Sequence, residues 1–332
     1  MQVLKTLGLA PALLAASLFA LNLAFVESSL APERPAANDN KGKKKSAAKK
    51  ADKSDERFSE SGASLDCQMQ IVSVGLPDVT EASGVAIGRR TASVLWTHGD
   101  SYAGEPVLYA IDSKGVVKGK VRIEGIRVTD WEDIDVGPCG RSSCVYIADI
   151  GDNNGIRKNI TIHRVPEPLP TDASARPGDS FQITFPDGPQ DAEAMFLSSS
   201  GEMFIVTKGD TGPIAVYRLG GSPKPGSITQ LKKVGVIQDG PVKRNEWITG
   251  ASQSPDGKWI VMRTHHSVLF YEADRLMKGD MKSPLWSDVS SLREPQGEGI
   301  ALGADGSVYL VGEGGRKGAA GTLATGTCKL PS

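Results

Sequence analysis

The feature that most constrains the fold of this chain is a short segment that recurs five times. The copies begin at residues 83, 132, 193, 249 and 298, so their starts are 49, 61, 56 and 49 residues apart. Each copy is a short alternating segment, and a turn connects it to a second, more apolar one. The second segments are Val94–Thr97, Val145–Ala148, Met203–Val206, Trp259–Met262 and Val308–Val311. They keep the same register from copy to copy, so the copies are structural repeats.

A unit of about 50 residues with several short strands and no helical period is typical of a β-propeller blade. Further strand candidates supply the outer part of the blades: Pro106–Asp112, Ile160–Val165, Ile214–Leu219 and Val268–Glu272. The sequence therefore predicts an all-β protein, a β-propeller of five blades over residues 67–332.

The four cysteines support closure of such a ring. Cys67 opens the first predicted strand of the folded part, and Cys328 lies in the last one, where the two termini of a propeller meet if an N-terminal strand completes the final blade. We predict a Cys67–Cys328 disulfide there and a small local loop at Cys139 and Cys144. The alternative is four free or metal-binding thiols.

The N-terminal residues differ in composition from the repeats. Residues 1–31 combine a basic start, a run rich in Leu and Ala and a small-x-small pattern before Pro32, which indicates a signal peptide or, if it stays uncut, a membrane anchor. Residues 32–66 are rich in Lys, Ala and Ser and are predicted to form a disordered tether. We expect a periplasmic or secreted monomer, or one anchored to the inner membrane, with membrane contact only through the N-terminal segment if that segment stays uncut.

Charge is distributed unevenly along the chain. Residues 1–58 hold 10 Lys/Arg and 6 Asp/Glu out of totals of 38 and 39, which leaves 28 and 33 and a net charge of about −5 for the rest. An acidic folded part argues against binding to nucleic acid, because that affinity depends on neutralising phosphates.

The acids gather where the first strand of each blade lines the central channel. The residues at the start of the repeats, Ser83, Glu132, Glu193, Thr249 and Glu298, form a ring at one mouth of that channel. Two residues earlier, on the same face of each strand, stand Glu81, Asp130, Asp191, Trp247 and Gln296. Converging carboxylates repel one another unless a cation joins them, and hard oxygen donors suit Ca²⁺ or Mg²⁺. The predicted metal ligands, Ca²⁺ being the expected ion, are Asp130, Glu132, Asp149, Asp152, Asp191, Glu193 and Glu298.

Two simpler explanations stay open for these acids. The carboxylates of the ring can instead cap backbone amides or pair with Lys and Arg of neighbouring blades. The Asp149–Arg157 segment offers oxygens to a cation, but it is also compatible with an Asn- and Gly-rich turn that satisfies its own hydrogen bonds. Lys208, Arg157 and Arg263 bring positive charge to the same rim, which suits an anionic ligand. Candidate catalytic residues are Glu132, Glu193, Lys208, Arg263 and His265.

Five motifs carry a resemblance to a family. They are Asp130–Asp133 (DWED), Asp149–Asn153 (DIGDN), Asp191–Met195 (DAEAM), Thr249–Gly257 (TGASQSPDG) and Gln296–Gly299 (QGEG). With these motifs the chain resembles exported bacterial β-propellers of uncharacterised function, and it is distantly similar to the phytase-like β-propellers, in which carboxylates at the channel mouth hold Ca²⁺ that binds phosphate. It departs from the phytases in having five predicted blades rather than six, and in having Ser83 and Thr249 at ring positions where acids are expected.

Two functions follow from these observations. The first is a binding protein that holds a divalent cation and a small anionic or carbohydrate ligand at the channel mouth. The second is a metal-dependent hydrolase of phosphoesters or lactones, with a carboxylate such as Glu132 or Glu193 positioning water.

Overall fold

The computed structural model describes residues 62–332 with the exception of 77–78, 101–103, 222, 316–317 and 332. The predicted leader and most of the predicted tether lie outside these residues. Within the described part, no helix has the length and apolar character that crossing a membrane requires.

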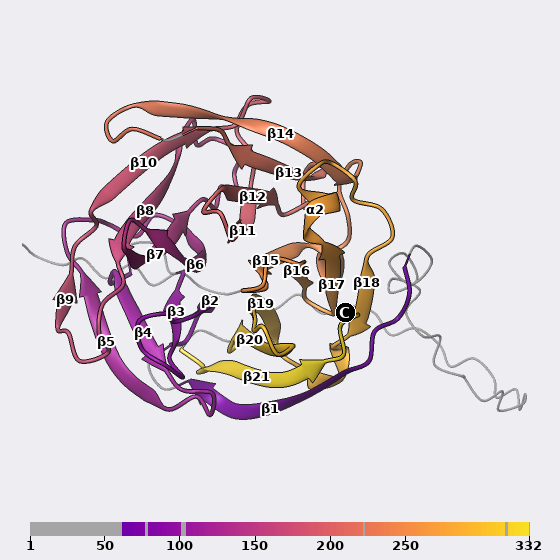
Figure 1. Ribbon diagram of the computed structural model, residues 1–332, viewed down its shortest axis with the longest axis horizontal. Coiled ribbons are helices and arrows are strands. Elements are labelled where there is room, and N and C mark those ends of the chain that lie inside the picture. The colour runs from indigo at the N-terminus through magenta and orange to yellow at the C-terminus, as the bar shows by residue number, and fades with distance from the viewer. Residues whose placement is uncertain (1–61, 77–78, 101–103, 222, 316–317, 332) are drawn as a thin grey trace, which may run out of the picture. The chain divides into compact units, whose positions relative to one another are not determined.

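The described strands form five four-stranded antiparallel blades arranged around a central axis, which confirms the predicted β-propeller (Figure 1). Blade 1 contains β2 (Ala82–Ile87), β3 (Leu95–Gly99), β4 (Val107–Ile111) and β5 (Val117–Ile123). Blade 2 contains β6 (Trp131–Cys139), β7 (Ser142–Asp149), β8 (Ile160–Pro166) and β10 (Asp179–Thr184). Blade 3 contains β11 (Ala192–Leu197), β12 (Met203–Thr207), β13 (Ile214–Leu219) and β14 (Ile228–Gln238). Blade 4 contains β15 (Ile248–Gln253), β16 (Trp259–Thr264), β17 (Ser267–Glu272) and β18 (Leu285–Asp288), and blade 5 contains β19 (Gln296–Leu302), β20 (Ser307–Glu313), β21 (Gly321–Cys328) and β1 (Cys67–Leu76).

The predicted inner and middle strands all form, and the structure adds outer strands that the sequence pattern did not single out. Two parallel pairings connect blades at their outer edges. In one, β10 pairs with β14, and in the other β5 pairs with β9 (Ser174–Ala175). Short helical turns lie between strands: η2 (Arg244–Glu246), α2 (Ala273–Leu276) and η3 (Ser290–Leu292).

The ring closes through the two ends of the folded part. Strand β1 pairs with β21, with Cys67 opposite Cys328, and in Figure 1 the indigo and yellow strands lie side by side. The predicted Cys67–Cys328 disulfide is confirmed, with 4.1 Å between the Cα atoms and 261 residues between the cysteines. The predicted local bond between Cys139 and Cys144 is also present. In the chain-entropy model, a loop as long as the first one stabilises the fold by about 5.6 kcal/mol.

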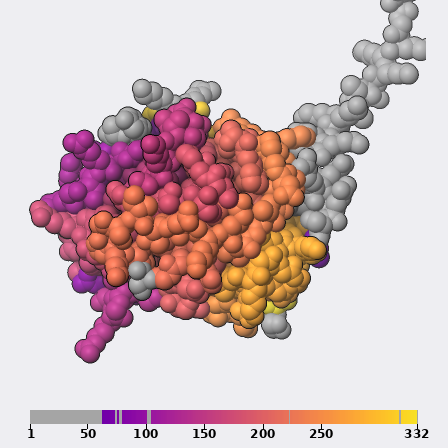
Figure 2. All heavy atoms as spheres, turned by 90° about the horizontal axis from the view of Figure 1, so that it is seen from above, coloured from indigo at the N-terminus to yellow at the C-terminus, as the bar shows by residue number. Residues whose placement is uncertain are grey.

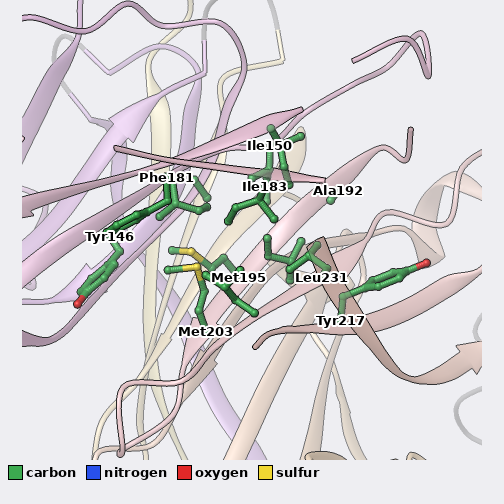
Figure 3. Packing of buried hydrophobic residues seen from close by; sticks show 14 of the residues in the cluster. Tyr146, Ile150, Phe181, Ile183, Ala192, Met195, Met203, Tyr217 and Leu231 are labelled. Carbon is green, nitrogen blue, oxygen red and sulfur yellow. The ribbon is translucent and has the colours of Figure 1, made fainter. Parts of the chain in front are cut away.

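Apolar side chains fill the space between neighbouring blades. The described residues form five such clusters, one for each pair of adjacent blades, the last of which joins blade 5 to blade 1. Figure 3 shows the cluster between blades 2 and 3, where Phe181 and Ile183 face Met195 and Met203. Figure 2 shows the propeller from its side, with the magenta and orange segments packed directly against one another. This packing holds the five inner strands in fixed positions around the axis.

Candidate functional site

A β-bulge marks the predicted ring position in every blade. Glu132 is the unpaired residue between the Trp131–Asp149 and Asp133–Ala148 pairs, and Glu193 and Thr249 interrupt β11 and β15 in the same way. In β2 and β19, the register shift spans Ser83–Gly84 and Glu298–Gly299. A bulge leaves one residue outside the ladder and re-aims its side chain. The structure therefore gives the five ring residues equivalent places.

The two ring residues that are not acids connect blades. The Ser83 hydroxyl donates to the carbonyl of Glu132 at 2.5 Å, and the Thr249 hydroxyl donates to the carbonyl of Glu298 at 2.9 Å. Each of them therefore fixes the backbone of an acidic ring residue on the next blade. This gives a structural reason for Ser83 and Thr249 at these positions.

The acids of the ring are buried and have acidic neighbours. Glu132, Glu193 and Glu298 are each less than a tenth exposed. Burial raises the pKa of Glu132 well above its usual value, and the charges of Glu193, Asp130 and Asp100 raise it further. Burial also raises the pKa of Glu298 well above its usual value, together with the charges of Glu193 and Glu313.

Acids nearer to solvent share this environment. Burial, with the charges of Glu313, Glu81 and Asp130, raises the pKa of Asp100 to about 7. Burial and the charge of Asp191 raise the pKa of Asp130 to about 6, although Arg157 opposes the shift. Asp100 stands at the end of the second strand of blade 1. The sequence analysis left it out of the proposed metal ligands.

The blade 3 side of the mouth has a resident cation. Lys208, immediately after β12, forms ion pairs with Glu193 and with Asp191, the latter at 3.4 Å. Its ammonium group also lies 3.3 Å from Oδ1 of Asn153 and 4.9 Å from the centre of the Trp247 ring. Burial lowers the pKa of Lys208, but the charges of Glu193 and Asp191 outweigh it and raise the pKa overall. Lys208 is therefore neutralised by the acids around it.

The carboxylates of the Asp149–Arg157 segment are used largely by backbone amides, of the segment itself and of the residues before β6. Asp149 accepts the amides of Thr129 and Asp130 and is paired with Arg157 at 2.7 Å. Asp152 accepts the amides of Ile156 and Arg157 at 2.9 and 2.8 Å. Of the two explanations that stayed open for this segment, the self-satisfied turn is the one that these hydrogen bonds support.

Arg263 and His265 are also engaged with the protein. Arg263 is completely buried, pairs with Glu294 and donates to the carbonyls of Gly299 and Val311 at 3.1 and 2.7 Å. Nδ1 of His265 lies 2.9 Å from the carbonyl of Gly297, so this nitrogen carries the hydrogen, while burial lowers the pKa of the ring to about 4. Neither side chain presents a free positive charge to the mouth.

Below the mouth, the inner strands approach so closely that only small residues fit at most of the positions directly after the ring residues. A Cβ on Gly84 would lie 2.6 Å from the amide nitrogen of Ile134, and one on Gly299 would lie 2.3 Å from the carbonyl oxygen of Ser83. Blade 2 carries Asp133 at the position that corresponds to these glycines.

The Asp133 carboxylate fills the centre of the propeller. It is completely buried and accepts three backbone amides: Ile134 on its own strand, Met195 of blade 3 and Ala251 of blade 4, at 2.9, 2.9 and 3.1 Å. Because blades 2 and 4 are not neighbours, the carboxylate spans the axis. The signal for Asp133 is present in the sequence, because it is the one acid among small residues at this repeat position.

The acidic cluster satisfies one condition for a cation site. Oε1 of Glu298 is buried and has no hydrogen-bond partner among the residues that the structure describes, which is costly unless another group joins it. The oxygen donors also suit a hard divalent ion. In the described residues, no three His, Cys, Asp or Glu side chains are already arranged to hold a metal. The oxygen donors of these residues fit such an ion chemically.

Comparison with known proteins shows the fold. No protein-family profile matches the chain, and no curated protein sequence does. Among solved structures, the major allergen Mala s 1 of Malassezia sympodialis is similar with a TM-score of 0.51 and 12% identity, over 79% of this chain and 96% of that one.

Two further solved structures have lower scores. The PQQ-bound aldose sugar dehydrogenase from Streptomyces coelicolor has a TM-score of 0.48 at 11% identity, over 80% of this chain and 99% of that one. The calcium-binding protein regucalcin from Agrobacterium tumefaciens has a TM-score of 0.43 at 9% identity, over 80% of this chain and 96% of that one. At such identities, the likeness concerns the fold alone and says nothing of the site.

Proposed function

We propose that this protein is an exported binding protein whose propeller mouth holds a divalent cation, Ca²⁺ being the best fit to its oxygen donors. The leader-like N-terminal sequence and the two disulfides support export, because disulfides persist in oxidising compartments. The cation then provides the positive charge for a small anionic or carbohydrate ligand, since Lys208, Arg157 and Arg263 are all paired with acids.

The observation that carries the proposal is the unpartnered Oε1 of Glu298 in an acidic surrounding. Glu132, Asp100, Asp130 and Glu313 lie within electrostatic reach of one another or of Glu298, and their pKa values are all raised. A divalent cation among these oxygens would relieve the repulsion that raises those values. Asp149 and Asp152, also predicted as ligands, then hold the neighbouring loop in position. Asp191 and Glu193 are shared with Lys208.

The test is Ca²⁺ binding by calorimetry to protein that has been stripped of metal with a chelator. We expect binding by the wild type and its loss in the double variant Glu132→Gln, Glu298→Gln. The matched control is Glu105→Gln, Glu124→Gln, which removes two carboxylates from the exposed surface. Circular dichroism checks that each variant is folded. A wild type that takes up no Ca²⁺, or a folded double variant that binds it equally well, would show that the proposal is wrong.

A second function, metal-dependent hydrolysis of a phosphoester or lactone, rests on the pair Glu132 and Glu193. Burial raises the pKa of both, but Lys208 opposes the shift at Glu193, which leaves its pKa at about 8. A buried carboxyl group that keeps its proton can act as a general acid, and an ionised one can position water. A panel of phosphoesters and lactones, assayed with Ca²⁺ and with chelator, decides between the functions. Turnover that disappears in Glu132→Gln indicates an enzyme, and absence of turnover leaves the binding protein.

A further inference from the structure

Lys208 occupies a place that is built like a cation site. Its ammonium group is surrounded by two carboxylates, Asp191 and Glu193, by the amide oxygen of Asn153 and by the ring of Trp247. These groups come from the loop after β7, from blade 3 and from the start of blade 4. The Lys208 side chain is only 9% exposed, so it closes the blade 3 side of the mouth.

Three of the four surrounding groups present oxygen atoms of the kind that hard divalent ions prefer. The fourth, Trp247, attracts a cation through the face of its ring. The surrounding groups therefore hold the Lys208 ammonium as they would hold a bound cation, except that the ammonium is covalently part of the chain.

We propose that Lys208 is a tethered counterion that occupies a cation position of the mouth, and that a divalent cation binds there in exchange for its ammonium group. This rests on the proposed function for the identity of the incoming ion. The ammonium and a divalent cation would share Glu193, and Glu132 lies within electrostatic reach of both, so the two positive charges oppose each other.

The exchange requires only the side chain to move. Gly209, which follows Lys208, has a φ of +88°, and a Cβ there would lie 2.4 Å from Cγ1 of Ile214. The backbone is therefore held closely at this point, while the four-carbon stem of Lys208 can swing toward the solvent. Its departure frees the carboxylate of Glu193 next to that of Glu132.

The first test compares Ca²⁺ affinity in wild type, Lys208→Met and Lys208→Arg. Methionine keeps an apolar stem beside Trp247 and removes the charge, whereas arginine keeps the charge. We expect Lys208→Met to bind Ca²⁺ at least about tenfold more tightly, which is the effect of about 1.4 kcal/mol, and Lys208→Arg to stay near the wild type. Lys258→Met, which removes an exposed lysine 4.0 Å from Asp256, is the matched control.

The second test uses the wild type and therefore does not depend on folding of a variant. Acetic anhydride modifies accessible lysines, and mass spectrometry measures the rate at each site. We expect saturating Ca²⁺ to accelerate the acetylation of Lys208 several-fold and to leave Lys258 unchanged.

The outcomes separate the two proposals. If the wild type binds Ca²⁺ but acetylation of Lys208 is not faster, the counterion proposal is wrong and the cation site still stands. The same holds if a folded Lys208→Met does not bind Ca²⁺ more tightly than the wild type. No Ca²⁺ binding by wild type or by Lys208→Met overturns both. Ca²⁺ binding in Lys208→Met but not in the wild type overturns both the exchange and the proposed function, because the ammonium group then keeps Ca²⁺ out of the wild-type mouth.

Discussion

Glu132 and Asp133 are adjacent in the sequence, yet the centre and the mouth of the propeller give their carboxylates opposite environments. Asp133 accepts three backbone amides from three blades. Glu132 lies one residue nearer to the mouth, and the charges that shift its pKa are those of Glu193, Asp130, Asp100 and Asp191. Both side chains are buried.

The difference separates a structural acid from a candidate functional one. A buried carboxylate with enough donors stabilises the fold, whereas one surrounded by like charges destabilises it until a cation or a proton joins it. Burial alone therefore does not identify the site. The hydrogen-bond partners of each buried carboxylate distinguish the structural acid from the candidate functional one.

The largest effect is expected at Asp133. Asp133→Ala leaves three buried amides without an acceptor, so we expect a loss of about 3–5 kcal/mol in the free energy of unfolding. Urea denaturation measures it. Asp135→Ala, which removes an acceptor of only two amides, serves as the comparison and should cost less. Equal losses would contradict a special role for Asp133 at the axis.

A smaller effect is expected from pH when the mouth contains no added cation. The pKa values of Asp130, Asp100 and Glu193, about 6, 7 and 8, lie above those of an unfolded chain. The folded protein therefore holds more protons than the unfolded chain between pH 5 and 8, and its free energy of unfolding falls as the pH rises. Thermal unfolding in chelator at several pH values measures this. Stability that rises from pH 5 to 8 would contradict the proposed repulsion, and added Ca²⁺ should flatten the profile.

The smallest effect is expected for Glu132→Gln. Without metal, this substitution should stabilise the protein by roughly 0.5–1 kcal/mol, because the neutral amide neither repels the neighbouring acids nor needs a proton to avoid that repulsion. In saturating Ca²⁺, the same substitution should be destabilising relative to the wild type. Denaturation with and without Ca²⁺ tests the change of sign, and Glu105→Gln should show none. The same sign under both conditions would show that Glu132 is not a ligand.

Much of the fold was predictable because the blades repeat. The spacing of the five copies gave the number of blades, and the positions of Cys67 and Cys328 gave the closing disulfide, which is confirmed. The turn that connects the two segments of each copy was predictable too, and in blades 4 and 5 it contains Gly257 and Gly306, which adopt positive φ values of +74° and +80°. The outermost strands β5, β10, β14 and β18 were not predicted, and the parallel β10–β14 pairing depends on which blade lies beside which.

The candidate site was predictable in position but not in the role of each residue. The register of the repeats placed Ser83, Glu132, Glu193, Thr249 and Glu298 at equivalent positions, and the bulges bear this out. The sequence had no means of telling that Lys208 would pair with Glu193, or that Asp149 would be used by backbone amides. These partners come from different blades or different loops, and their distances are set by blade packing.

The sequence by itself determined a five-bladed ring with acids at one mouth, because periodic hydrophobicity and residue spacing are local properties that each repeat carries. Only the tertiary structure decided which acids are satisfied. Closure of the ring brings Asp133 to the amides of two other blades and leaves Oε1 of Glu298 without a partner. The physical reason is that the state of a buried charge depends on every group within a few ångströms, and those groups are distant in the chain.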